Sequence, residues 1–130
     1  MSKSVFLSFK EEDRDAVLLI KGRAVNSNYS KLDFKTRDLL KRWNVEDRPG
    51  IKRAITTKIQ GTSKTIVFVG KKTHESYWVP HEVRMTLEQN KPVYAIHLSG
   101  IKGVIPKCLS SNCIKVHAWS EEKLQKLANM

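Results

Sequence analysis

The segment Thr65–Glu82, with the sequence TIVFVGKKTHESYWVPHE, decides the fold class of this chain. Its first residues, Thr65–Val69, form an apolar run without polar alternation, which predicts a strand buried on both faces of a sheet. A glycine and a short polar loop follow. The residues Trp78–Glu88 then predict a helix, which tolerates Pro80 because this proline falls in the first turn. A buried strand, a loop and a helix in this order are the repeating unit of α/β proteins.

The rest of the chain alternates in the same way between short strands and helices. Further strands are predicted at Ser4–Phe9, Lys31–Phe34, Pro92–Leu98 and Ile114–Trp119. Further helices are predicted at Asp15–Arg23, which should be heavily buried, at Ile51–Ile59, and after a capping Ser120. The alternation predicts a single domain over residues 1–130 with a flavodoxin-like, three-layer α/β fold. In it, helices cover both faces of a five-stranded parallel sheet.

The composition is that of a globular protein with a basic surface. The formal net charge is +11, from 24 Lys and Arg against 13 acids, but the basic residues are scattered and form no run. Such a surface attracts polyanions, and it serves solubility equally well. No apolar run approaches the roughly 20 residues that span a membrane, and the first residues do not resemble a signal peptide. A cytoplasmic location without a membrane partner is therefore expected.

Several phosphate-handling classes with this architecture are excluded by the sequence. A phosphoacceptor receiver domain needs an aspartate at the end of the third strand, where this chain has Val69 and Gly70. A flavin-binding relative needs a loop rich in Gly, Ser and Thr after the first strand, but the loop here reads KEEDRD and repels phosphate. Neither a Walker loop nor a GxGxxG motif is present. The two cysteines, Cys108 and Cys113, have too few ligating neighbours for a metal site, so no metal is expected.

Four motifs, in order and with compatible spacing, carry a resemblance to a known family. They are VFLSF at Val5–Phe9 followed by EED, KGRAVNSN at Lys21–Asn28 with KLDF at Lys31–Phe34, the WxxxE segment that ends at Glu82, and NKPVYAIHL at Asn90–Leu98. Together they resemble the Toll/interleukin-1 receptor (TIR) family, and within it the bacterial TIR-like proteins of the Thoeris antiphage type. The resemblance spans most of Lys3–Leu98. The loop that follows Phe34 departs from the subgroup's usual sequence.

The resemblance implies an NAD+-consuming enzyme in which the WxxxE glutamate, Glu82, is the catalytic residue. NAD+ would be the substrate, and no cofactor is implied. The chemistry of NAD+ cleavage is consistent with a catalytic carboxylate. Cleavage of the nicotinamide–ribose bond releases a neutral leaving group and builds positive charge on the ribose. A fixed carboxylate can offset that charge without a general acid. An exposed acid near a helix start is the alternative interpretation of Glu82.

Substrate contacts are predicted for Ser8, Phe9, Arg23, Asn26, Asn28 and Trp78. Ser8 and Phe9 end the first strand, where ligands bind in open α/β sheets, although ordinary packing at a strand end would explain them too. Arg23 offers a phosphate its planar fork of donors. Asn26 and Asn28 can grip ribose hydroxyls, but turn formation is the simpler explanation of both. Trp78 shares a helix face with Glu82, but packing is the simpler explanation of this residue.

Three hypotheses on function follow from the sequence. The first is an NAD+ glycohydrolase or cyclase that self-associates and makes an ADP-ribose-derived nucleotide signal for a separate effector protein. The second is a non-catalytic TIR-like interaction or scaffold module that assembles through its loops and basic residues. The third and weakest is a basic nucleic-acid binder. The sequence leaves open whether water, a group of the same molecule or a free base accepts the ribose, which would give hydrolysis, cyclisation or base exchange.

Overall fold

The computed structural model describes residues 3–24, 34–37 and 48–130, with side chains at 5–20, 50 and 52–130. The strands are β1 (Lys3–Ser8), β2 (Phe34–Arg37), β3 (Lys64–Val69), β4 (Val93–His97) and β5 (Val116–His117). The helices are α1 (Arg14–Ala24), α2 (Arg48–Gln60), α3 (Trp78–Glu88), α4 (Lys107–Ser110) and α5 (Glu121–Asn129). Short 3-10 turns occur at Glu11–Asp13 (η1) and Thr73–Glu75 (η4). None of the helices in these ranges is long and apolar enough to cross a membrane.

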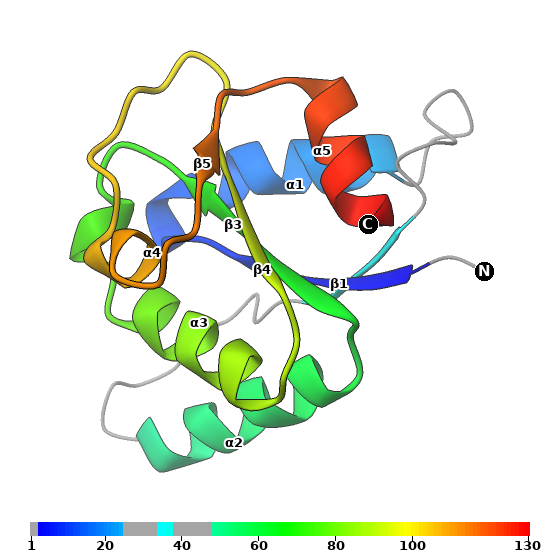
Figure 1. The fold of residues 1–130 in the computed structure, drawn as a ribbon, viewed down its shortest axis with the longest axis vertical. Coiled ribbons are helices and arrows are strands. Elements are labelled where there is room, and N and C mark those ends of the chain that lie inside the picture. The colour runs from blue at the N-terminus through cyan, green and yellow to red at the C-terminus, as the bar shows by residue number, and fades with distance from the viewer. Residues whose placement is uncertain (1–2, 25–33, 38–47) are drawn as a thin grey trace.

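The strands form one five-stranded sheet in the order β2-β1-β3-β4-β5, and every pairing is parallel (Figure 1). β3 lies at the centre, with Leu7 of β1 opposite Ile66 and Ala95 of β4 opposite Val67. The predicted fold class, a flavodoxin-like parallel sheet of five strands, is therefore confirmed. The carboxyl ends of β1, β3 and β4 meet at one edge of the sheet, which is where such folds bind ligands.

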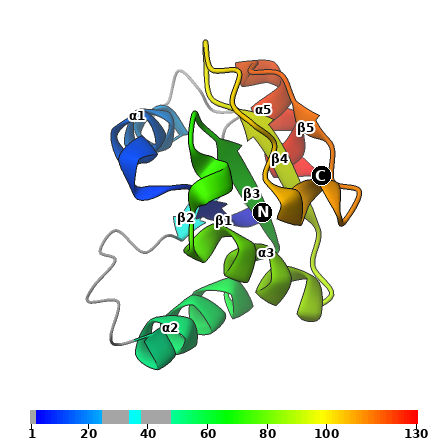
Figure 2. The same ribbon diagram turned by 90° about the vertical axis from the view of Figure 1, so that its left-hand side faces the viewer.

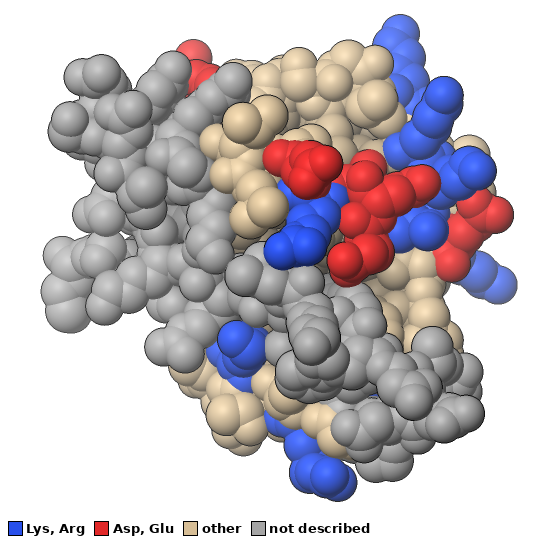
Figure 3. Space-filling view, turned by 180° about the vertical axis from the view of Figure 1, so that it is seen from behind, with Lys and Arg blue, Asp and Glu red and all other residues tan. Residues whose placement is uncertain are grey.

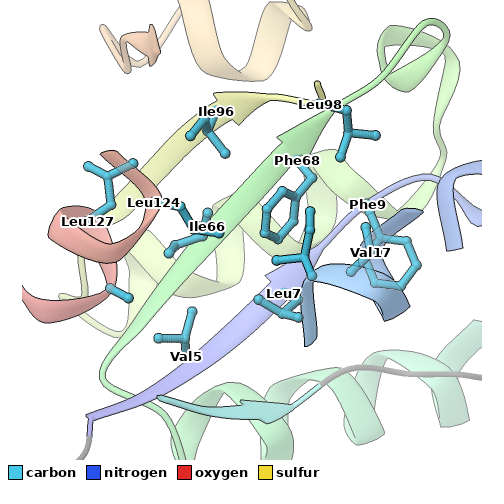
Figure 4. Close-up of a cluster of buried hydrophobic side chains, with 12 residues drawn as sticks. Val5, Leu7, Phe9, Val17, Ile66, Phe68, Ile96, Leu98, Leu124 and Leu127 are labelled. Carbon is cyan, nitrogen blue, oxygen red and sulfur yellow. The ribbon is translucent and has the colours of Figure 1, made fainter. Parts of the chain in front are cut away.

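Helices cover both faces of the sheet, so the molecule has three layers (Figure 2). Helices α1 and α5 pack on one face around Leu7, Ile66 and Phe68 (Figure 4). Helices α2, α3 and α4 cover the other face, where Val67 and Val69 are buried. Successive β3 residues thus point into two different cores, and this explains why the strand carries no polar alternation.

Two elements differ from the sequence-based expectation in their position. The strand expected at Lys31–Phe34 is β2, Phe34–Arg37, so only Phe34 is common to both; residues 31–33 lie outside the described ranges. β2 is an edge strand that pairs with β1 alone, so it needs no apolar run to form. The helix expected at Ile51 begins already at Arg48. Pro49 is tolerated in its first turn, where a missing N–H costs no hydrogen bond.

The expectation that the first helix is heavily buried is wrong. Val17 and Ile20 are buried against the sheet, but Leu19 is 69% exposed. A helix that lies on the surface of a sheet buries only one stripe of its side chains, however apolar its sequence. The last strand is also shorter than expected, because only Val116 and His117 of the range 114–119 pair with β4. The predicted cap of the last helix is confirmed, since Ser120 Oγ accepts a hydrogen bond from the Lys123 backbone N–H.

A buried lysine connects β3 to the end of α5. Lys64 is 1% exposed, and its Nζ donates hydrogen bonds to the backbone carbonyls of Leu127, Ala128 and Met130 at 3.2, 2.7 and 2.6 Å. The last carbonyls of a helix have no partner within the helix, and they carry its partial negative charge. The ammonium group satisfies these carbonyls and fixes the end of α5 on the sheet.

Lys64→Met should lower the free energy of unfolding by about 2 kcal/mol or more, because it leaves buried carbonyls without a donor. Lys91→Met is the matched control. Lys91 Nζ makes the same kind of bond to the carbonyls of Ile59 and Gln60, but nearer the surface, so its loss should cost about 1 kcal/mol or less. Urea unfolding of both variants measures the difference. Equal losses would contradict a special role for Lys64.

Candidate active site

A buried hydrogen bond joins the end of β1 to the second turn of α3. Ser8, the last residue of β1, and Glu82 are each fully buried, with 0% exposure. Ser8 Oγ donates to Glu82 Oε1 at 2.7 Å. The structure thus brings two of the sequence-predicted site residues into contact at the carboxyl edge of the sheet. Glu82 is not the exposed acid that the alternative interpretation required.

Two threonines fix the helix that carries Glu82. Thr86 Oγ1 donates to the backbone carbonyl of Glu82 at 2.7 Å, one turn back along α3. The same hydroxyl lies 2.6 Å from Thr65 Oγ1 on β3, and all three residues are buried. These bonds hold α3 against the central strand. The sequence analysis missed both threonines, although a threonine four residues after the glutamate is a recognisable signal for such backbone bonding.

Trp78 occupies a packing position. Only 8% of it is exposed, and it belongs to a cluster with Phe6, Ile55 and Ile59 between the sheet, α2 and α3. The Tyr77 ring meets its indole edge-on, with 4.8 Å between the ring centroids. Trp78 and Glu82 do share the buried face of α3, as their spacing predicts, and the indole anchors the start of that helix.

Of the remaining predicted contacts, only Phe9 can be placed relative to Glu82 in the described part of the chain. Phe9 is 2% exposed and packs with Val17 on the face covered by α1, the opposite face from Ser8 (Figure 4). Alternation along an extended chain separates the two neighbours in this way. Arg23 lies in the last turn of α1, but its side chain, like the whole of Asn26 and Asn28, lies outside the described part of the chain.

A second carboxylate lies at the same edge of the sheet, within the acidic KEEDRD segment that follows the first strand. Asp13, in η1, lies so close to Gly70 that a β-carbon at Gly70 would collide with its carboxylate. On Gly103, a β-carbon would collide with the Gly70 carbonyl oxygen. The Gly70 N–H donates to Thr73 Oγ1 at 2.7 Å. Three chain segments therefore meet beyond the end of β3, and the backbone contact makes Gly103 the position where a side chain has no space.

The environment of Asp13 disfavours its charged form. Burial, together with the negative charge of Glu12, raises the pKa of the Asp13 carboxyl, although Lys10 opposes the shift. Its Oδ2 atom is buried and has no hydrogen-bond partner among the described residues. Among the residues that the structure describes, no group of three His, Cys, Asp or Glu side chains could hold a metal ion.

The parallel sheet, its helix order and the buried WxxxE glutamate define a TIR-like domain. The chain matches the family model described as "Thoeris protein ThsB, TIR-like domain" over residues 6–102, more than half of its length. It belongs to the Thoeris ThsB TIR-like family. The matched region includes Ser8, Asp13 and Glu82.

Solved structures agree on the fold. The TIR domain of the Toll-related receptor TRR-2 from Hydra magnipapillata superposes with a TM-score of 0.60 at 16% identity, over 97% of this chain and 91% of that one. A 3-dehydroquinate dehydratase-like protein from Bifidobacterium longum gives a TM-score of 0.50 at 16% identity, over 99% of this chain and 97% of that one. At 16% sequence identity, the similarity to these two structures concerns the fold alone. The comparison with curated proteins gave no match.

The bond between Ser8 and Glu82 can be tested by a double-mutant cycle. Ser8→Ala should cost about 1–3 kcal/mol, because it removes a donor from a buried carboxylate. In a Glu82→Gln background the same change should cost less, with a coupling energy of about 1 kcal/mol or more. Urea unfolding of the four proteins measures the coupling. Strictly additive losses would show that the two side chains do not interact.

Asp13→Asn should become more stabilising as the pH rises. Because the pKa of Asp13 is raised in the folded state, the folded protein binds its proton more tightly than the unfolded chain. The wild-type protein therefore loses stability as the pH rises from the ordinary carboxyl pKa of 3.8 through the folded value. The variant lacks this loss, so its advantage in unfolding free energy should be larger at pH 7 than at pH 3.5.

Urea unfolding at several pH values measures the difference between Asp13→Asn and wild type. Asp15→Asn, an exposed acid in the first turn of α1, is the control for the change in net charge. An advantage of Asp13→Asn that stays constant between pH 3.5 and 7 would contradict the assignment of a raised pKa to Asp13.

Proposed function

We propose that this protein consumes NAD+ by cleaving the bond between nicotinamide and ribose, with Glu82 as the catalytic carboxylate. The observation that carries the proposal is the placement of Glu82. Its carboxylate is buried, held by Ser8 at the carboxyl edge of a parallel sheet, and lies within the region matched by the TIR-like family model. Membership of this family supports the choice of substrate.

The chemistry assigns Glu82 an electrostatic role. When the bond from ribose C1′ to the nicotinamide nitrogen breaks, its electron pair goes to the ring nitrogen and nicotinamide leaves as a neutral molecule. Positive charge develops on the ribose, and a carboxylate fixed beside C1′ lowers the energy of that state. Water can then attack C1′ and lose a proton to solvent, which gives ADP-ribose. Attack by a nucleophile of the same molecule gives a cyclic product instead.

The buried state of Glu82 has a consequence for activity. Because the carboxylate has no contact with solvent, ribose can approach it only after the groups that cover it move. Conformational closure and opening of this kind control turnover in many enzymes. We propose that self-association or another activating event uncovers the site, and that the ADP-ribose-derived product acts as a signal for a separate effector. Assays at high protein concentration are therefore the appropriate ones.

Glu82→Gln should reduce nicotinamide release from NAD+ at least about 100-fold, the usual effect of removing one electrostatic stabiliser from an active site. Glu88→Gln is the matched control. Glu88 lies on the same helix, but its side chain is 67% exposed and pairs with Arg84 at 3.7 Å. It should retain wild-type turnover. Chromatography with mass detection of nicotinamide and of the nucleotide product measures the turnover of both variants.

Two results would overturn the proposal. Turnover that survives Glu82→Gln would remove Glu82 from the mechanism. Complete absence of turnover by the wild-type protein at every concentration, together with retained self-association, would instead favour a non-catalytic TIR-like scaffold.

A further inference from the structure

A basic hollow lies between β5 and α5, away from Glu82. Its volume is about 560 Å³, within the usual range of small-ligand pockets. Its polar lining consists of Lys115, His117, Ser120, Glu122, Lys123 and Lys126. Val116, Ala118 and Trp119 complete it. Glu82 belongs to α3 on the other face of the sheet, so this hollow is not part of the proposed catalytic site (Figure 1).

The charges in this hollow are unbalanced. Three ammonium groups, of Lys115, Lys123 and Lys126, face a single carboxylate, that of Glu122, which leaves an excess of two positive charges. The excess positive charge also acts on His117. Its partial burial, together with the charges of Lys123 and Lys115, lowers the pKa of the His117 imidazole. The hollow is therefore a place where a bound dianion would relieve repulsion between cations.

An aromatic wall adjoins these charges. Trp119 is half-buried and also lines a second hollow of about 730 Å³ beside the carboxyl end of β4. His97 and Lys102 contribute to that second hollow, so basic side chains line both this hollow and the one between β5 and α5. Indole faces stack well on nucleobases, and lysines bind phosphate as point charges.

We infer that the hollow between β5 and α5 is a second ligand site, which binds the diphosphate of a nucleotide such as ADP-ribose, with the base against Trp119. The excess of two positive charges matches the two negative charges of a diphosphate diester. A nucleic acid would need a long basic track. The lining of this hollow instead includes the carboxylate of Glu122 among its three lysines. On the opposite side of the molecule from the view of Figure 1, acidic side chains also lie beside basic ones over the described part of the face (Figure 3).

Nuclear magnetic resonance of the wild-type protein tests the site without turnover. Inorganic pyrophosphate and ADP-ribose, each added at physiological salt, should raise the pKa of His117 by about one unit, because a negative charge then lies beside the imidazole. ADP-ribose should also shift the indole N–H signal of Trp119. The signal of Trp78, on the Glu82 helix, reports on the catalytic site separately. The result therefore stands whether or not NAD+ is cleaved.

Matched variants assign the effect to this hollow. Lys123→Gln with Lys126→Gln should weaken ADP-ribose binding at Trp119 at least tenfold, and Lys115→Gln should weaken it in the same direction. Lys52→Gln with Lys58→Gln removes the same charge from α2 and should leave binding unchanged.

Three results would overturn the inference. One is unchanged His117 and Trp119 signals in the presence of both ligands. Another is equal loss of binding in the two double variants. The third is a response of Trp119 to a single-stranded oligonucleotide at lower concentration than to ADP-ribose, which would make the hollow a nucleic-acid contact.

Discussion

The contact between Ser8 and Glu82 is the constraint on which the candidate site depends. A carboxylate removed from water is costly unless donors replace its hydration, and the Ser8 hydroxyl supplies one at 2.7 Å. That bond requires the end of β1 and the second turn of α3 to stay in register. The bond from Thr86 to the Glu82 carbonyl, and the bond between the Thr86 and Thr65 hydroxyls, maintain this register from one turn further along the same face of the helix. Fold and site are thus stabilised by the same few polar contacts.

The carboxyl edge of the sheet shows a second constraint of the same kind. The Asp13 carboxylate, Gly70 and Gly103 lie in close contact, and Gly103 leaves no room for a side chain. At Gly103 the close neighbour is the backbone of Gly70 and Lys71, so the loop after β3 and the loop before α4 pack backbone against backbone at this edge.

Much of this arrangement could be read from the sequence, because its signals are local. The apolar run of β3, the start of α3 at Trp78 and the cap at Ser120 each depend on neighbouring residues, and each was predicted correctly. β2 was misplaced because an edge strand has no apolar pattern to detect.

The residues that escaped prediction depend on partners far away in the sequence. Lys64 is a charged residue inside a strand, and nothing near it reveals that the end of α5 will accept its hydrogen bonds. The contact of Asp13 with Gly70 is equally non-local. Position at the end of β1 predicted that Ser8 and Phe9 both border the carboxyl edge. Ser8 does contact Glu82 there, whereas the alternation of the strand turns Phe9 to the other face.

The charged residues behind the net charge of +11 are distributed unevenly between the proposed catalytic site and the proposed nucleotide site. NAD+ carries a cationic nicotinamide ring at one end and a diphosphate in its middle, so no uniform surface suits all of it. The proposed catalytic carboxylate of Glu82 suits the cationic end, and it would repel phosphate at short range. Lys115, Lys123 and Lys126 have the opposite preference, and they lie just before β5 and on α5, away from Glu82. The sheet separates the two kinds of charge, so the proposed catalytic carboxylate and the proposed nucleotide site do not neutralise each other.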